Sequence, residues 1–229
     1  MHDDNDDDEY PPGLVAIGGD LEVPTLLHAY RQGMFPWFSE GEPILWWSLD
    51  PRMVLRVQDF KFHRSLKRVV NKLLANNTGS VRFDTAFADV IHACATTPRD
   101  GQNGTWISPA MQEAYCRLHE AGYAHSVETW MDGKLVGGLY CVAIGRAVFG
   151  ESMFAHRPDA SKIALAALVD FCYKNDVVAI DCQQNTRHLA SMGAREIGRD
   201  EFLRWIHDAQ HHAPLDWKSH RPNPLCSFT

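Results

Sequence analysis

A hairpin signal in the second half of the chain constrains the fold more than any other pattern. Two strand-like runs, AHSVETW and KLVGGLYCVAIG, flank Met131-Asp132-Gly133, and an Asp-Gly pair between such runs is typical of a tight turn. RAVFGESMF follows as a third strand, a long apolar-faced helix is expected at about 159–174, and DVVAIDCQ has the pattern of a buried strand. This order predicts an α/β (α+β) fold with a mixed central sheet and helices on its faces.

Capping residues and prolines predict further helices and a division of the chain. Pro24 in a first turn and Gly33 as a stop bound one helix, and Ser108 begins another that stops at Gly122. Three more helices are expected near 86–95, 186–192 and 200–211. We expect a disordered acidic tail at 1–12, a small N-terminal α/β domain at 13–51, and a larger domain at 52–229.

An aromatic segment from Met34 to Leu55, MFPWFSEGEPILWWSLDPRMVL, contains three of the seven tryptophans. Prolines at 36, 43 and 51 and a glycine at 41 interrupt long helices and strands, so short turns should present the rings. Rings held in this way favour stacking on nucleobases or similar planar ligands, and Trp37 is the first candidate. For Trp46 and Trp47, closure of a small core is the simpler interpretation.

Charge is unevenly distributed along the chain. Residues 3–9 hold six of the 29 acidic residues, so the rest of the chain has 23 acidic against 22 basic residues. By contrast, residues 52–72 hold seven basic residues and one acidic residue. The apolar spacing there predicts a helix with a basic exposed face, which favours phosphate binding, although a merely solvated face is an equal alternative. The basic residues are Arg52, Arg56, Lys61, Arg64, Lys67, Arg68 and Lys72.

The sequence lacks the motifs of several protein classes. No run of about eighteen apolar residues occurs, and the first residues are acidic, so neither a membrane span nor a secretory signal is expected. Six scattered cysteines without a C-x-x-C pair favour free thiols in a reducing cytoplasm. His207 and His211 are spaced for one helix face but lack an evident third ligand, and phosphate-loop and dinucleotide motifs are absent. We expect neither a metal nor a cofactor.

Polar residues end the predicted strand DVVAIDCQ, and rigid scaffolds commonly present reactive groups at strand ends. Strand alternation points Asp181 and Gln183 to one face and Cys182 to the other. A helix cap or a structural hydrogen bond is the simpler alternative for Asp181. Cys182 is a weaker candidate, as a nucleophile paired with His188, because buried thiols are usually inert.

The segment GESMF ends the third predicted strand with another acid, Glu151. Two large apolar residues, Met153 and Phe154, follow it. They line an apolar pocket or, in the commoner alternative, pack in the core.

Eight sequence blocks are spread over most of the chain from Leu14 to about Ile197. They are AIGGDL (16–21), AYRQGMFPWFSEGEPILWWSLDPR (29–52), GTWIS (104–108), EAYCRLHEAGYAHSVETW (113–130), LVGGLY (135–140), GESMF (150–154), ASKIAL (160–165) and IDCQ (180–183). In this order the blocks resemble the bacterial leucyl/phenylalanyl-tRNA–protein transferase family, and together they are highly specific, although any four-residue block alone is weak. The chain departs from the family pattern at Leu49, at Ala155-His156 and in both termini.

The resemblance implies a GNAT-like acyltransferase domain in a cytosolic, monomeric enzyme. Such an enzyme moves leucine or phenylalanine, and less readily methionine, from aminoacyl-tRNA to proteins with N-terminal Arg or Lys, which marks them for degradation. The donor ester is already activated, so the resemblance implies no ATP, metal or other cofactor. The apparent alternatives are a small-molecule acetyltransferase, which lacks a coenzyme A pyrophosphate motif here, and a non-catalytic RNA-binding module, which leaves the acidic residues unexplained.

The resemblance also assigns site residues. It places Gln183 on the attacking nitrogen, Asp181 behind Gln183, and Glu151 beside the cationic acceptor, so that Glu151 and Asp181 form an acidic pair. The positions expected at the terminal adenosine of the tRNA are Trp37, Tyr30, Trp106 and Tyr115. Those expected in the apolar amino-acid pocket are Met153, Phe154 and Ile180. Those expected on the tRNA backbone are Arg52, Lys61, Arg64, Lys67 and Arg68.

Overall fold

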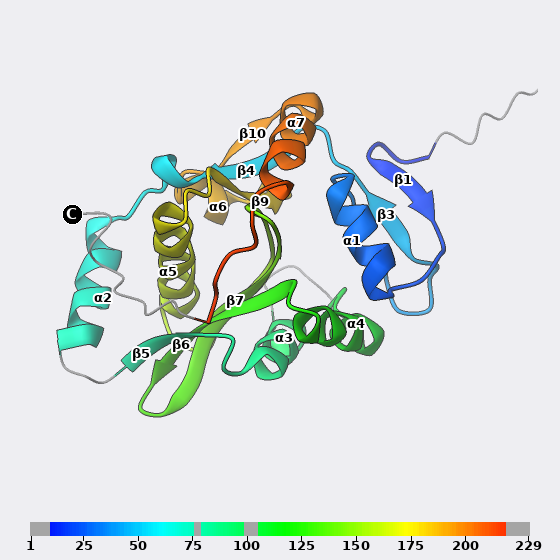
Figure 1. Cartoon of the computed structure of the whole chain (residues 1–229). Coiled ribbons are helices and arrows are strands. Elements are labelled where there is room, and N and C mark those ends of the chain that lie inside the picture. Colours follow the sequence, from blue (N-terminus) through cyan, green and yellow to red (C-terminus); the bar gives the residue numbers. More distant parts are fainter. Residues whose placement is uncertain (1–9, 76–78, 99–104, 219–229) are drawn as a thin grey trace, which may run out of the picture.

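The structure is a computed structural model that describes residues 10–75, 79–98 and 105–218. The chain forms a small sheet near its N-terminus and a large sheet in the centre (Figure 1). The fold class expected from the sequence, with a mixed central sheet between helices, is confirmed. The acidic residues of the predicted tail lie outside the described residues.

The large sheet has seven strands in the order β10-β4-β9-β8-β7-β6-β5. Neighbouring strands are antiparallel except β8 and β9, which are parallel. The predicted hairpin is confirmed, because β6 and β7 pair from Met131 and Lys134 onward. The strands are β4 (Arg52–Arg56), β5 (Gly79–Phe83), β6 (Ala124–Met131), β7 (Lys134–Ile144), β8 (Ala147–Ala155), β9 (Ala179–Gln183) and β10 (Arg195–Ile197).

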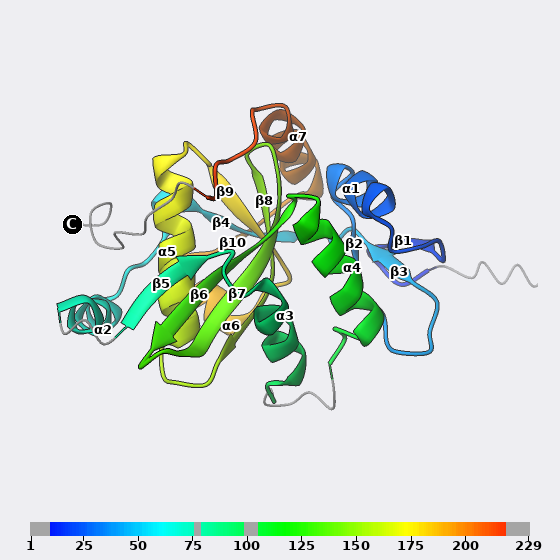
Figure 2. The same ribbon diagram turned by 60° about the horizontal axis from the view of Figure 1, so that its bottom comes forward.

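Helices cover both faces of the large sheet, as the two views in Figures 1 and 2 show. On one face, α2 (Arg64–Ala75), α5 (Ala160–Lys174) and the short 3-10 helix η1 (Val57–Asp59) share a core with the sheet. On the other face, the core includes α1 (Val23–Arg31), α3 (Phe87–Thr96), α4 (Pro109–Glu120) and α7 (Arg199–Gln210). A short helix, α6 (Arg187–Ser191), follows β9. These helices confirm the sequence prediction to within a few residues at each end.

The small sheet has the order β1-β3-β2 and lies in the expected N-terminal α/β domain, although its individual strands were not predicted. Its strands, β1 (Leu14–Ile17), β2 (Phe35–Pro36) and β3 (Leu45–Trp47), have only two to four residues. Long strands are absent from the described aromatic segment, as expected, but the short strands β2 and β3 accompany its turns, since Phe35 pairs with Trp47 and Pro36 with Trp46. This pairing buries Trp46, which agrees with its interpretation as a core residue.

The parallel pair β8–β9 diverges along its length. A parallel pair needs a long crossover connection, which α5 provides here. The paired positions are Val148 with Ile180 and Phe149 with Asp181, yet β8 continues to Ala155. The side chains beyond these pairs therefore border a gap in the sheet that opens toward the small sheet and α6.

Two local features fix the helices near this gap. Gly137 in β7 lets α5 come close, because a Cβ at that position would collide with the Cβ of Ala160. On the opposite face, the buried carboxylate of Glu128 accepts hydrogen bonds of 2.8 Å from the backbone N–H groups of Thr85 and Ala86. Glu128 therefore ties the two residues just before α3 to β6 and fixes where the helix starts.

The predicted basic helix is confirmed as α2. Leu66, Val70 and Leu73 are buried on its inner side, while Arg64 and Arg68 are exposed. In the described parts of the chain, no helix is long and apolar enough to cross a membrane.

Candidate active site

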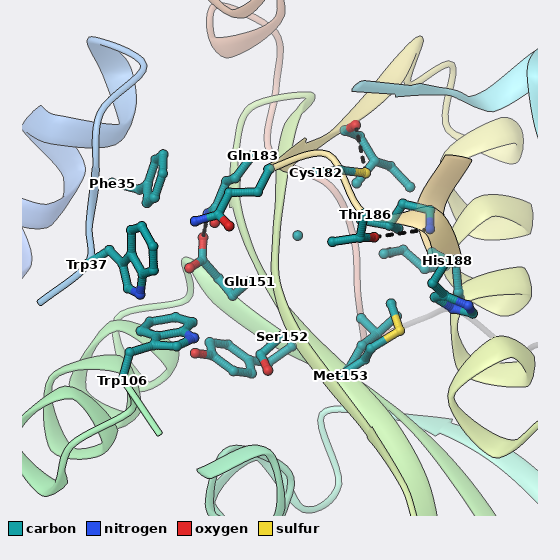
Figure 3. A pocket seen from close by; sticks show the side chains of 18 of the residues that line it. Phe35, Trp37, Trp106, Glu151, Ser152, Met153, Cys182, Gln183, Thr186 and His188 are labelled. Carbon is teal, nitrogen blue, oxygen red and sulfur yellow. Dashed lines mark hydrogen bonds between the residues drawn. The ribbon is translucent and has the colours of Figure 1, made fainter. Parts of the chain in front are cut away.

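A pocket of about 540 Å³ lies where β8 and β9 diverge (Figure 3). The aromatic segment supplies one wall, with Phe35 and Trp37, and Trp106 lies beside them. Glu151 of β8 and Gln183 of β9 face each other in the middle. The far side is apolar, so the pocket combines a polar centre with room for an apolar side chain. This apolar side is lined by Met153, Leu165, Leu168, Ile180, Cys182 and Leu189.

Three side chains lie within hydrogen-bond distance of Glu151. Its Oε1 accepts from the Tyr30 hydroxyl at 2.7 Å and from Gln183 Nε2 at 3.0 Å. Its Oε2 lies 3.4 Å from the Tyr115 hydroxyl, and this hydroxyl also contacts that of Tyr30, so the single proton of Tyr115 serves either Glu151 or Tyr30. Among the described residues that line the pocket, Glu151 is the only one with a carboxylate. The negative charge of this pocket therefore depends on one residue.

Burial raises the pKa of Glu151 from 4.5 to about 7, because an enclosed carboxylate loses its solvation by water. The hydrogen bonds from Tyr30 and Gln183 oppose this rise; the charge of Asp181 adds to it, and the charge of Arg52 opposes it. Burial also raises the pKa of both tyrosines well above 10, so their hydroxyls remain donors. Glu151 thus exchanges a proton near neutral pH, which sequence reasoning missed because the enclosing residues are remote in the chain.

Asp181 and Arg52 form an ion pair, and both side chains are fully buried. Arg52 Nε donates to Asp181 Oδ1 at 2.9 Å, Nη2 donates to Oδ2 at 2.7 Å, and Nη1 donates to the carbonyl oxygen of Gly33 at 3.2 Å. The prediction that Arg52 contacts the tRNA backbone is wrong, because its guanidinium is enclosed within the fold. The expected acidic pair is wrong as well, since Arg52 already balances the charge of Asp181.

Gln183 ends β9 in a left-handed conformation with a φ of +59°. Its backbone N–H donates to Asp181 Oδ1 at 2.9 Å, a turn in which an aspartate stabilises the backbone two residues on. Simple alternation therefore stops before Gln183, and both Cys182 and Gln183 line the pocket. Because Nε2 of Gln183 donates to Glu151, the side-chain Oε1 is left to accept a hydrogen bond from a ligand.

The predicted adenosine-binding aromatics fall into two groups. Trp37 is 39% exposed, and Trp106 is partly exposed at the pocket, so both can offer a ring face. Trp47 steadies Trp37, because its indole N–H donates to the Trp37 carbonyl oxygen at 2.7 Å. Tyr30 and Tyr115 are fully buried, so the expectation that they contact adenosine is wrong, and their hydroxyls bind Glu151 instead.

Two of the three residues predicted in the amino-acid pocket lie in the cavity, and their role there stays a prediction. Met153 and Ile180 line the pocket, whereas Phe154 does not. Phe154 is buried in the core on the α3 side, because successive residues of β8 alternate between the two faces. Cys182 lines the pocket with a thiol whose pKa is strongly raised by burial, so it stays protonated and is a poor nucleophile.

A second polar cluster, outside the pocket lining, contains Asp84, His119 and His125, with candidate ligand atoms within 4.8 Å of one another. His125 Nδ1 lies 2.8 Å from Asp84 Oδ2, and His119 Nδ1 lies 2.7 Å from the Ala124 carbonyl oxygen. Asp84 Oδ1 accepts the backbone N–H of Ser126 at 2.8 Å. Since these atoms already bind within the protein, the cluster is explained as a hydrogen-bond network between β5, α4 and β6.

The other residues predicted on the tRNA backbone lie on or just before α2. Lys61, Arg64 and Arg68 are exposed, and Lys67 is partly exposed. Their placement leaves them accessible to a phosphate backbone, and their role stays a prediction.

Two family models match consecutive parts of the chain. Residues 54–207 match the model described as leucyl/phenylalanyl-tRNA protein transferase, and residues 19–50 match the N-terminal domain of that family. A leucyl/phenylalanyl-tRNA–protein transferase from Polaromonas sp. (strain JS666 / ATCC BAA-500) is 63% identical over 195 residues, which cover 85% of this chain and 76% of the relative.

A relative of the same name from Leptothrix cholodnii is 57% identical over 213 residues, which cover 92% of this chain and 82% of the relative. Among solved structures, a conserved protein of unknown function from Bacteroides thetaiotaomicron aligns with a TM-score of 0.42 and 12% identity. That alignment covers 72% of this chain and 57% of the other.

Proposed function

The chain belongs to the leucyl/phenylalanyl-tRNA protein transferase family, and from that premise we propose that it transfers leucine or phenylalanine, and less readily methionine, from aminoacyl-tRNA to a protein. The acceptor is the α-amino group of proteins that begin with Arg or Lys, and the product is marked for degradation by the N-degron pathway. The observation that carries this proposal is the Gln183–Glu151 hydrogen bond beside an apolar pocket.

The donor binds through its terminal adenosine and its amino-acid side chain. The exposed ring of Trp37 supports stacking of the adenine, with Trp106 beside it. The apolar side of the pocket, including Met153 and Ile180, supports burial of a leucine or phenylalanine side chain, which stabilises binding by roughly 1.5–3 kcal/mol. Basic residues contact the tRNA backbone without reading its sequence. They are Lys61, Arg64, Lys67 and Arg68.

The chemistry is attack of an amine on an activated ester. A protein N-terminus has a pKa near ~8, so at neutral pH it arrives mainly as an ammonium ion. Glu151, with its pKa of about 7, takes one proton from this ammonium and later releases it to water. The nitrogen then bonds to the ester carbonyl carbon, the bond from that carbon to the ribose oxygen breaks, and a second nitrogen proton passes to that oxygen.

Gln183 aligns the attacking nitrogen. Its Oε1 accepts an N–H of the amine, while its Nε2 stays on Glu151. Asp181 acts behind it by fixing the backbone turn of Gln183. Since Arg52 balances Asp181, the charge that favours a cationic acceptor comes from Glu151 alone.

We place the protein in the cytoplasm, because its aminoacyl-tRNA donor is made there, and we retain the monomer implied by the resemblance as a proposal. We also retain the division at residue 51 between a small N-terminal domain and the transferase domain as a proposal. The change from the small to the large sheet after β3 and the two family matches, 19–50 and 54–207, support this division.

The direct test is a transfer assay with tRNA that carries labelled leucine. A peptide that begins with Arg should gain the label at its N-terminus, and an otherwise identical peptide that begins with Gly should not. Mass spectrometry identifies the new amide bond. Acetyl-CoA with the same Arg peptide tests the acetyltransferase alternative and should give no product. Folded protein that binds leucyl-tRNA but leaves the Arg peptide unlabelled would disprove the proposed function.

A further inference from the structure

Arg52 is the largest fully buried side chain of the described residues, yet it touches no substrate in the proposed reaction. We propose that Arg52 is a positioning residue that holds the donor-binding aromatic segment and the reacting end of β9 in one fixed arrangement. This inference rests on the proposed function and adds a residue to it. Three sets of contacts made by one guanidinium group support the inference. Nε and Nη2 bind Asp181, Nη1 binds the carbonyl oxygen of Gly33, and the guanidinium carbon lies over two phenylalanine rings.

The guanidinium fork fixes the carboxylate behind Gln183. Two parallel hydrogen bonds, of 2.9 and 2.7 Å, allow Asp181 one orientation of its carboxylate plane. In that orientation Asp181 Oδ1 also accepts the Gln183 backbone N–H at 2.9 Å. Gln183 has a left-handed φ, which a residue with a side chain adopts only when its surroundings hold it there. Arg52 therefore acts on Gln183 through Asp181.

The remaining contacts of Arg52 reach the aromatic segment. Nη1 donates to the carbonyl oxygen of Gly33 at 3.2 Å, at the end of the α1 region and just before β2. The guanidinium carbon lies 4.8 Å from the ring centroid of Phe35 and 4.4 Å from that of Phe202 in α7. Phe35 itself lines the pocket, two residues before Trp37. One side chain thus joins the wall that binds the donor to the strand that presents Gln183.

These contacts need the shape of arginine as well as its charge. A lysine ammonium could neutralise Asp181, but it has no planar fork and cannot lie over the rings of Phe35 and Phe202 while it also reaches Gly33. Buried ion pairs often add little to stability compared with apolar residues of similar size. Geometry, more than stability, is therefore the property that Arg52 supplies.

Arg52 also changes the electrostatics of the site. Its positive charge lowers the pKa of Glu151, whereas the negative charge of Asp181 raises it. The other titratable groups that contact Glu151 are Tyr30 and Tyr115, which stay protonated. Loss of the charge at Arg52 should therefore move the titration of Glu151 to higher pH, whereas a change in geometry alone should leave it in place.

The test compares Arg52→Lys and Arg52→Met with the wild type and with Arg146→Met. Arg146 lies outside the pocket lining and is partly exposed, in a surface ion pair with Asp176, so it controls for loss of an arginine. Circular dichroism first establishes that each variant is folded. Transfer of leucine to the Arg peptide is then followed from pH 6 to 8.5, with kcat and peptide KM determined separately.

We expect Arg52→Lys to lower kcat by about tenfold or more, because misplaced reacting groups cost factors of this size. Its pH midpoint should stay that of the wild type. Arg52→Met should lose more activity and shift the midpoint upward by about one pH unit, as expected when an opposite charge is removed nearby. Arg146→Met should behave like the wild type.

Two outcomes overturn the inference while the proposed function survives. One is a folded Arg52→Lys with wild-type kcat. The other is a folded Arg52→Met whose activity loss comes without any shift in the pH midpoint. If Arg52→Met does not fold, Arg52→Lys decides alone. A wild-type protein that transfers no leucine would instead contradict the proposed function.

Discussion

Replacement of Glu151 by Gln should separate the charge of this residue from its shape. The amide keeps the size of the carboxyl group and can still accept hydrogen bonds, but it cannot ionise. With a pKa of about 7, wild-type Glu151 is about 90% ionised at pH 8 and about 10% ionised at pH 6. Ionised Glu151 with the ammonium carries the same number of protons as protonated Glu151 with the free amine. At equal concentrations of free amine, wild-type transfer should therefore rise about tenfold from pH 8 to pH 6. The Glu151→Gln variant should be slower and lack this rise.

The same substitution should change stability in a direction that depends on pH. Folding raises the pKa of Glu151 from 4.5 to about 7, so the folded state favours the protonated carboxyl group. The stability that this preference contributes is complete below pH 4.5 and is lost as the pH rises through 7. At pH 8 the buried charge costs about 3 kcal/mol relative to the neutral group, and at pH 5.5 it costs about 1 kcal/mol. The free energy of unfolding of the variant, relative to that of the wild type, should therefore be about 2 kcal/mol higher at pH 8 than at pH 5.5.

Both parts can be measured on the same protein samples. Single-turnover transfer, with peptide concentrations adjusted to equal free amine at each pH, isolates Glu151 from the titration of the substrate. Urea unfolding of the wild type and the variant at pH 5.5 and 8 gives the difference between their free energies of unfolding at each pH. Contributions from titrating groups that both proteins share cancel in this difference. Parallel pH profiles for the two proteins, together with a stability difference that does not change with pH, would refute the role given to Glu151.

Three other predictions concern substrate binding. Trp37→Ala should weaken binding of leucyl-tRNA by about 1–3 kcal/mol, the size of one base–aromatic stack, whereas Tyr173→Ala, at an exposed ring outside the pocket, should not. Equal affinities of the two variants, measured by filter binding, would exclude stacking. The double substitution Arg64→Glu and Arg68→Glu should reduce the slope of log affinity for tRNA against log salt concentration by about two. An unchanged slope would mean that α2 is only a solvated helix. Met153→Trp should fill the apolar side and reduce phenylalanine transfer by roughly tenfold relative to leucine transfer, and equal losses for both donors would place the side chain elsewhere.

Local signals allowed much of the fold to be predicted from the sequence. Ser108 before Pro109 marks the start of α4, and its side chain accepts a hydrogen bond from the Met111 backbone N–H at 3.3 Å. The turn at Asp132 sets the β6–β7 hairpin in the same local way. The small sheet was missed because its strands are too short to show a period, and Pro36 lies within one of them.

The site was harder to predict, because its charge balance depends on contacts between distant residues. Arg52 and Asp181 are 129 residues apart in the chain, and Tyr30 and Glu151 are 121 apart. From the sequence, Arg52 could only be grouped with the basic residues that follow it. A single arginine next to Met53, Val54 and Leu55 was the available hint that it starts a buried strand. Its partner could not be inferred without the fold.

The charge balance explains how one carboxylate can serve both binding and chemistry in the proposed reaction. Arg52 balances the charge of Asp181 and the tyrosine hydroxyls keep their protons, so within this hydrogen-bonded group Glu151 is the residue that changes its charge as pH crosses 7. Ionised Glu151 attracts the acceptor ammonium and then takes its proton, which removes both charges. The amide nitrogen of the product is neutral, so the attraction between Glu151 and the reacting nitrogen ends when the new bond forms, while the Arg or Lys side chain of the acceptor keeps its charge.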